Sequence, residues 1–214
     1  MLKDLSLKEF TDELASGSPA PGGGAAAGLS AAIGASLASM VFNLTVDRKA
    51  SENYPEDVKS AMKDALVTSD ELRARYIEFI DKDADSFNLL MAAYKLPKDT
   101  DEEKAARNEK ICEAKELVLQ VPRQLLNESY KLYDSLKVAS EYGNKNAISD
   151  AGVGAIMVHG AIEGAALNVF INLASMEVNE ETIAIKEESD KIVENSRCIK
   201  EDIVSQVIDK IYGR

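Results

Sequence analysis

The residue best placed to do chemistry is Asp83, a carboxylate inside an otherwise apolar stripe. Between Val58 and Tyr94, apolar residues recur at steps of three or four, which predicts one face of a long α-helix. Asp83 occupies a step of this stripe where the pattern calls for an apolar side chain. Asp81 and Asp85 are each two residues away, about 200° around the helix, and are therefore predicted to face solvent.

A carboxylate on a buried face has a chemical consequence. It costs free energy unless it is paired, hydrated or protonated. Burial also raises the pKa of a carboxyl group, which suits a group that takes up and returns a proton near neutral pH. Asp83 is therefore predicted to be a general acid and base. The alternatives are a solvated side chain and a structural hydrogen bond between helices.

Three consecutive glycines, Gly22, Gly23 and Gly24, precede a long uncharged run. Backbone N–H groups at the start of a helix can bind an anion or allow close approach of a ligand. No Gly-Lys-Ser/Thr follows and no strand precedes, so neither a P-loop nor a dinucleotide fingerprint is present. The simpler alternative is that the glycines only allow a turn and close packing.

Two pairs of polar residues share a helix face near the end of the chain. Asn168 and Asn172 are four residues apart, and buried amides need partners, which a ligand or another helix could supply. His159 and Glu163 have the same spacing and could form an ion pair or half of a metal site. With one histidine in the chain and no HExxH motif, no metal site is expected.

The elements that position these residues are all predicted to be helical, because nothing in the chain alternates as a strand does. A first helix begins at a capping box formed by Ser6 and Glu9 and stops near Gly17. Helices are expected over about 24–46 and, after Pro55, to about residue 96.

The second half of the chain repeats this pattern. Thr100 and Glu103 form another capping box, and Pro122 predicts either one kinked helix or two helices in succession. Gly143 ends that segment, and Ser149 or Asp150 is expected to cap the next helix. Two further helices are expected, over about 151–176 and 180–212. Residues 1–214 are predicted to form one all-α domain, a bundle of long antiparallel helices around two central helices rich in small residues.

Composition narrows the class of protein. A formal net charge of −12 argues against a nucleic-acid partner, because phosphate binding requires clustered Lys and Arg. Cys112 and Cys198 are far apart without CxxC spacing, which favours reduced thiols over a disulfide or zinc site. The first ten residues lack the apolar core of a secretory signal, and a cytoplasmic location is expected.

The uncharged run between Glu13 and Asp47 is long enough to cross a bilayer. It consists mainly of Ala, Gly and Ser rather than Leu and Ile, so its transfer into lipid would be weakly favourable. Small residues recur at every fourth position, which lets neighbouring helices approach closely. A central packed helix is therefore favoured over a membrane span.

Matching motifs, taken in order, cover nearly the whole chain. They are Ser18 to Gly24, Met40-Val41, Thr45, Arg48, Asp81 to Ala84 with Phe87, Leu96-Pro97-Lys98, Glu102-Glu103-Lys104 with Arg107, Val121-Pro122, Gly143-Asn144, Ser149-Asp150, and Asn168-Val169 with Ile171-Asn172-Leu173. Together they resemble the cyclodeaminase domain of formiminotransferase-cyclodeaminase and the related stand-alone bacterial methenyltetrahydrofolate cyclohydrolases. His159 and Glu163 fall outside the family's motifs.

The resemblance implies a helical homodimer acting on a tetrahydrofolate that carries a one-carbon unit on its 5- and 10-nitrogens. A cyclohydrolase adds water to 5,10-methenyltetrahydrofolate and opens the ring to 10-formyltetrahydrofolate. A cyclodeaminase closes the formimino compound to the methenyl compound and expels ammonia. Both reactions need a proton shuttle and no metal or redox cofactor.

The resemblance also implies roles for individual residues. The family's catalytic aspartate corresponds to Asp83, and the three glycines would let the pterin approach the backbone. The implied ligand contacts are Asn144, Asp150, Asn168 and Asn172, with Lys98 or Arg107 for the glutamate tail. Because no transferase domain accompanies the chain, the cyclohydrolase is the expected activity. The alternatives are the cyclodeaminase and a non-catalytic helical dimer.

Overall fold

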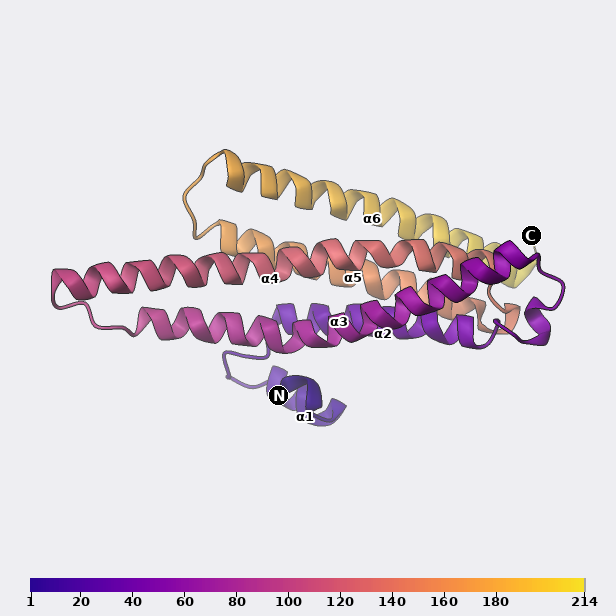
Figure 1. Cartoon of the computed structure of the whole chain (residues 1–214), viewed down its shortest axis with the longest axis horizontal. Coiled ribbons are helices and arrows are strands. Elements are labelled where there is room, and N and C mark those ends of the chain that lie inside the picture. The colour runs from indigo at the N-terminus through magenta and orange to yellow at the C-terminus, as the bar shows by residue number, and fades with distance from the viewer. Residues whose placement is uncertain (214) are drawn as a thin grey trace.

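The computed structural model describes residues 1–213 and consists of helices (Figure 1). The six α-helices are α1 (Leu7–Leu14), α2 (Gly23–Asn43), α3 (Glu56–Tyr94), α4 (Asp101–Tyr142), α5 (Ile148–Leu173) and α6 (Glu180–Tyr212). Three short 3-10 turns are η1 (Leu2–Asp4), η2 (Lys49–Ser51) and η3 (Lys145–Ala147). No strand occurs among the described residues, so the predicted all-α class is confirmed.

Local sequence signals set where most helices begin. The capping boxes of Ser6 with Glu9 and of Thr100 with Glu103 are both formed, and α1 and α4 begin after them. Pro122 lies inside α4, so this segment is one helix rather than two. The final helix has the bounds that the sequence predicts.

The start of α5 differs from the prediction. Ala147, rather than Ser149 or Asp150, is its N-cap, and both of the predicted caps lie in its first turn. The reason is the turn η3, in which the side chain of Asn144 accepts a hydrogen bond from the Asn146 amide at 3.0 Å. This turn runs directly into α5, so the helix needs no side-chain cap.

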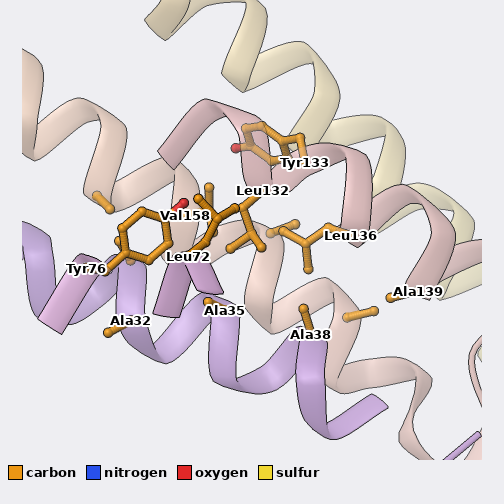
Figure 2. Packing of buried hydrophobic residues seen from close by; sticks show 14 of the residues in the cluster. Ala32, Ala35, Ala38, Leu72, Tyr76, Leu132, Tyr133, Leu136, Ala139 and Val158 are labelled. Atoms are coloured by element: carbon orange, nitrogen blue, oxygen red, sulfur yellow. The ribbon is translucent and has the colours of Figure 1, made fainter. Parts of the chain in front are cut away.

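The two small-residue helices, α2 and α5, pack against each other at the centre of the bundle, as predicted. They run antiparallel, because Gly23 lies beside Asn168 and Gly34 lies beside Val158. A side chain on Gly34 would lie 2.6 Å from Val158 Cγ2 and 3.1 Å from the Gly154 carbonyl oxygen. The hydroxyl of Ser30 donates to the Met157 carbonyl oxygen at 2.8 Å across the same seam. Figure 2 shows alanines of α2 close to large side chains of the surrounding helices in the core.

The long helices α3 and α4 form an antiparallel hairpin whose tip extends beyond the rest of the bundle (Figure 1). Near its middle α3 packs against α2, where a side chain on Gly28 would lie 3.3 Å from the Tyr76 carbonyl oxygen. The Tyr76 hydroxyl donates to the Glu128 carbonyl oxygen of α4 at 2.8 Å. These contacts hold α3 between α2 and α4.

The prediction that Asp81 faces solvent is wrong. Asp81 is only 7% exposed, whereas Asp85 is exposed as predicted. The turn η1 covers Asp81, and the Leu2 amide donates to its Oδ1 at 2.7 Å. Helical periodicity places Asp81 on the correct side of α3 but carries no information about a segment that folds over that side.

Two segments are long and apolar enough to span a membrane by length and composition: α2 and the stretch Lys145–Leu173. In the bundle, 61% of the apolar stretch of α2 and 44% of the apolar stretch of the second segment are buried. The burial of α2 agrees with its expected place as a central helix. The outer side of α5 remains uncovered.

Candidate active site at the N-terminus of helix α2

The Asp83 carboxylate of α3 lies against the first turn of α2. Its Oδ2 accepts a hydrogen bond from the Ala25 amide at 3.0 Å. Asp83 is half-buried, and this burial raises the pKa of its carboxyl group above the ordinary value, while the hydrogen bond from Ala25 opposes the rise. The predicted break in the apolar stripe is thus a partly desolvated carboxyl group with one backbone donor.

The three glycines have three different surroundings. A side chain on Gly24 would lie 2.7 Å from Asp83 Oδ2 and closer still to the rest of the carboxyl group. A side chain on Gly23 would lie 3.4 Å from the Asn168 side-chain nitrogen, whereas one on Gly22 would meet nothing within 4 Å. The first turn of α2 is therefore flanked by Asp83 and Asn168, with an open approach at Gly22.

This first turn also presents backbone donors. Helix geometry leaves the amides of Gly23 and Gly24 without acceptors inside α2, and the N-cap Gly22 provides no side-chain cap. On the other side, Asn168 donates its amide to the Gly164 carbonyl oxygen at 2.8 Å, which leaves its Oδ1 to accept. A small polar ligand would meet a carboxylate, an amide oxygen and two N–H groups here.

Two other predicted ligand residues lie at the opposite end of the bundle. Asn144 donates its side-chain amide to the Leu44 carbonyl oxygen at 3.0 Å, beyond the C-terminal end of α2. The 21 residues of α2 separate this end from Gly23 by about 30 Å at 1.5 Å per residue. Asp150 lies in the first turn of α5, about 27 Å from Asn168 by the same rise. Within one chain, Asn144 and Asp150 do not reach Asp83.

Of the remaining predicted contacts, Asn172 and Arg107 are bonded to other parts of the chain, whereas Lys98 is exposed. Asn172 donates to the Val118 carbonyl oxygen of α4 at 2.6 Å, so the structure assigns its amide to a contact between helices. Arg107 donates to the Tyr94 carbonyl oxygen at 3.3 Å, near the tip of the α3–α4 hairpin. Lys98 is exposed in the loop at this tip.

His159 belongs to a structural network rather than to the candidate site. Its Nδ1 is 2.8 Å from the Ser196 hydroxyl, which is also 2.8 Å from the Tyr133 hydroxyl. Its Nε2 is 3.4 Å from Glu163. Ser196 is fully buried, so its hydroxyl serves to join Tyr133 and His159 inside the bundle. Among residues 1–213, no group of three or more His, Cys, Asp or Glu is arranged to hold a metal ion.

One member of the site does not stand out in the sequence, the backbone amide of Ala25. It belongs to the third residue after the N-cap Gly22, a position where a helix amide has no partner inside the helix. The position could have been counted from the glycines. The sequence does not show which group accepts the hydrogen bond of this amide, because Asp83 is 58 residues away.

Comparisons with known proteins place this site in a family. The family model described as formiminotransferase-cyclodeaminase matches residues 6–191. The chain belongs to the formiminotransferase-cyclodeaminase family. The family match contains the whole candidate site, from Gly22 to Asn168.

Individual relatives of the family agree with this membership. The chain is 41% identical over 177 residues to a methenyltetrahydrofolate cyclohydrolase from Methylorubrum extorquens, covering 83% of each chain. It is 34% identical over 175 residues to the formimidoyltransferase-cyclodeaminase of Rattus norvegicus, covering 82% of this chain but only 32% of that protein. The crystal structure of a formiminotetrahydrofolate cyclodeaminase from Thermotoga maritima superimposes with a TM-score of 0.76 and 29% identity, covering 100% of this chain and 98% of that one.

Proposed function

We propose that this protein is a methenyltetrahydrofolate cyclohydrolase and that Asp83 moves the protons of the reaction. The observation that carries the proposal is that the half-buried Asp83 carboxylate of α3 accepts a hydrogen bond from the first turn of α2. It occurs in a chain that is 41% identical, over 83% of both lengths, to a protein named for this activity.

The chemistry needs one group that accepts a proton and then returns it. As water attacks the amidinium carbon between the 5- and 10-nitrogens, ionised Asp83 takes one of the water protons and a neutral tetrahedral carbinolamine forms. The protonated carboxyl then gives its proton to the 5-nitrogen as the bond from that nitrogen to carbon breaks. The remaining hydroxyl proton leaves to solvent as the formyl carbonyl forms. These steps involve proton transfers only, so no cofactor enters the proposal.

The surroundings of Asp83 suit both halves of this cycle. A raised pKa makes the carboxyl a better base than an exposed aspartate and moves its titration toward neutral pH. The open approach at Gly22 and the Oδ1 of Asn168 are proposed to accommodate the polar ring edge of the pterin.

The cyclodeaminase is the second candidate because a specific observation favours it. The Thermotoga maritima protein, named as a formiminotetrahydrofolate cyclodeaminase, matches the chain over its whole length. In that reaction the 10-nitrogen attacks the formimino carbon, and Asp83 would protonate the departing nitrogen as ammonia leaves.

Direct assay separates the two activities. Purified protein is given 5,10-methenyltetrahydrofolate while the methenyl absorbance is followed, and separately 5-formiminotetrahydrofolate while ammonia release is followed. We expect loss of methenyl absorbance and no ammonia. Ammonia release without hydrolysis would replace the first activity with the second. Inactivity on both substrates would favour a non-catalytic helical dimer.

We further propose that the protein is a homodimer formed through the outer sides of α2 and α5. The exposed apolar residues of these two helices, here called the α2–α5 face, are Ile33, Met40, Leu44, Val153, Ile156, Leu167 and Ile171. Leu167 and Ile171 are 66% and 68% exposed, which is unfavourable for side chains of this size in water. A second copy is the proposed occupant, because a twofold axis would bring this apolar face against the same face of the partner and bury the exposed apolar residues of both subunits.

Such a dimer would also bring Asn144 and Asp150 of one subunit close to Asp83 of the other. A twofold axis perpendicular to α2 places the Asp83 end of one subunit beside the Asn144 end of its partner. Asp150 lies three residues before Val153 and so on the same side of α5 as the face. Asp150 is therefore proposed to reach the active site of the partner subunit.

The oligomeric state can be tested with a matched pair of variants. Ile156→Glu places a charge inside the α2–α5 face and is expected to give a monomer in sedimentation analysis. Val178→Glu places the same charge on another apolar residue, 80% exposed, that lies outside this face, and it should leave a dimer. A monomeric parent protein would contradict the proposal.

A further inference from the structure

The closest approach at the candidate site is made by a glycine of α2 and a carboxylate of α3. The three atoms that a side chain on Gly24 would meet first are Oδ1, Cγ and Oδ2 of Asp83. The space of the missing Cβ is therefore already filled by the carboxyl group. Neither Gly22 nor Gly23 has this relation to Asp83.

The backbones of α2 and α3 cannot separate easily to make room for a larger residue. One turn further along α2, the Cβ position of Gly28 is 3.3 Å from the Tyr76 carbonyl oxygen and 3.5 Å from the Ile80 amide nitrogen. Tyr76 is fully buried and its hydroxyl is bonded to α4. A methyl group on Gly24 would therefore displace the Asp83 side chain rather than the helices.

We propose that Gly24 is a positioning residue. Because it has no side chain, the Asp83 carboxylate fits against the first turn of α2, in a space that we call the seat. In this seat the Ala25 amide holds Oδ2 at 3.0 Å, which leaves Oδ1 for proton transfer to and from the substrate. The catalytic part of this inference rests on the proposed function. The seat itself is a property of the folded chain and can be tested without substrate.

A double-mutant cycle tests the seat through thermal unfolding. Gly24→Ala is expected to lower the melting temperature of the parent protein. In the Asp83→Ala background the carboxyl group is gone, the added methyl has room, and the same substitution should no longer lower it. An equal loss in both backgrounds would show that the methyl meets something other than Asp83 and would overturn the seat.

A second measurement follows the carboxylate directly. In the parent protein the Ala25 amide resonance is expected to shift with pH as Asp83 titrates, and Asp83→Asn should abolish that shift. Gly24→Ala should abolish it too, since the displaced carboxylate no longer accepts from Ala25. Gly22→Ala adds the same methyl two residues away, where it meets nothing within 4 Å, and should keep the shift. A shift that persists unchanged in Gly24→Ala would contradict the proposal.

Turnover then connects the seat to catalysis. Gly24→Ala should lower kcat by at least about 100-fold, the lower range for loss of a positioned general acid or base. Gly17→Ala, which also meets nothing within 4 Å and lies outside the site, serves as the activity control. Coupling in the cycle together with an unchanged kcat would overturn the positioning role. Coupling in the cycle together with an inactive parent protein would support the seat but contradict the proposed cyclohydrolase activity.

Discussion

At the scale of single residues, Asp83 experiences two opposing influences. Removal from water raises the pKa of its carboxyl group, and the Ala25 amide lowers it by stabilising the charged form. Burial is the larger influence, so the folded protein binds the proton of Asp83 more tightly than the unfolded chain does. An ionised carboxylate in this position therefore costs stability at neutral pH.

Removing the charge of Asp83 should therefore separate activity from stability. Asp83→Asn retains an oxygen that can accept from Ala25 but cannot transfer a proton. We expect kcat to fall by at least about 100-fold. The melting temperature should rise at pH 7, because a carboxyl whose pKa is raised contributes stability that is present below its unfolded value of 3.8 and is lost as the pH rises through the folded value.

Thermal melts at pH 7 and near pH 3 test the stability half of this prediction. The gain should be present at pH 7 and shrink at the acidic pH, where Asp83 is protonated in both states. Asp85→Asn, on the exposed side of the same helix, should show neither effect. A lower melting temperature for Asp83→Asn at pH 7 would mean that the Asp83 charge stabilises the fold.

At the scale of helices, close approach and a buried polar network hold the bundle together. The seam between α2 and α5 depends on Gly34, where a Cβ would lie 2.6 Å from Val158. Between α4, α5 and α6, the fully buried Ser196 hydroxyl joins Tyr133 to His159. Each of these contacts gives a prediction of its own.

Substitution of Gly34 should destabilise the bundle without touching the candidate site. Gly34→Ala forces a methyl group against Val158 and the Gly154 carbonyl, and overpacking of this kind costs about 1–3 kcal/mol. Urea unfolding followed by circular dichroism measures the loss. Gly17→Ala is the control, because its methyl meets nothing within 4 Å. Equal stability of both variants would show that the seam can open at no cost.

The network around His159 predicts how stability depends on pH. Burial lowers the pKa of His159 below its ordinary value of 6.5; Lys200 and Arg197 act in the same direction, while Glu163 and Glu201 oppose it. A lowered pKa means that the neutral ring is favoured in the folded state. Its contribution to stability is present above pH 6.5 and is lost as the pH falls through the folded value.

Urea unfolding between pH 8 and pH 5 measures this contribution. We expect the free energy of unfolding to fall as the solution is acidified below pH 6.5. His159→Gln keeps a hydrogen-bonding side chain beside Ser196 but cannot be protonated, so its decline over this range should be smaller. Identical pH profiles for the parent and the variant would assign the decline to other groups.

At the scale of the whole molecule, the length of α2 separates residues that the family resemblance assigns to one ligand site. Asp83 and Asn168 lie at one end of α2, while Asn144 and Asp150 lie at the other, about 30 Å away. The exposed apolar residues of the α2–α5 face lie between the two ends. An antiparallel dimer would cover these residues and give each site one contribution from each subunit.

Mixed dimers test whether the sites are shared. Asp83→Asn and Asp150→Asn are each expected to be impaired alone. If Asp83 and Asp150 act in one site from different subunits, random mixing of the two chains restores one intact site in half of the dimers, about a quarter of the parent turnover. Unmixed samples at the same total concentration are the control. No recovery on mixing would place both residues' effects within one subunit.

Local patterns in the sequence predict the helices and single out Asp83. Helix bounds follow from local signals, such as the capping boxes at Ser6 and Thr100, because capping and periodicity depend on residues only a few positions apart. The same periodicity singled out Asp83, whose break in the stripe is visible within one helix. Its catalytic role remains a prediction.

The surroundings of these residues arise only from the packing of the helices against one another. The burial of Asp81 under η1, the seating of Asp83 on Gly24, and the distance of Asn144 from both depend on chain segments far apart in sequence. No local pattern encodes such contacts, because they result from how whole helices pack. Asp83 is positioned by a glycine 59 residues before it in the printed sequence, and that pairing exists only once α2 and α3 lie side by side.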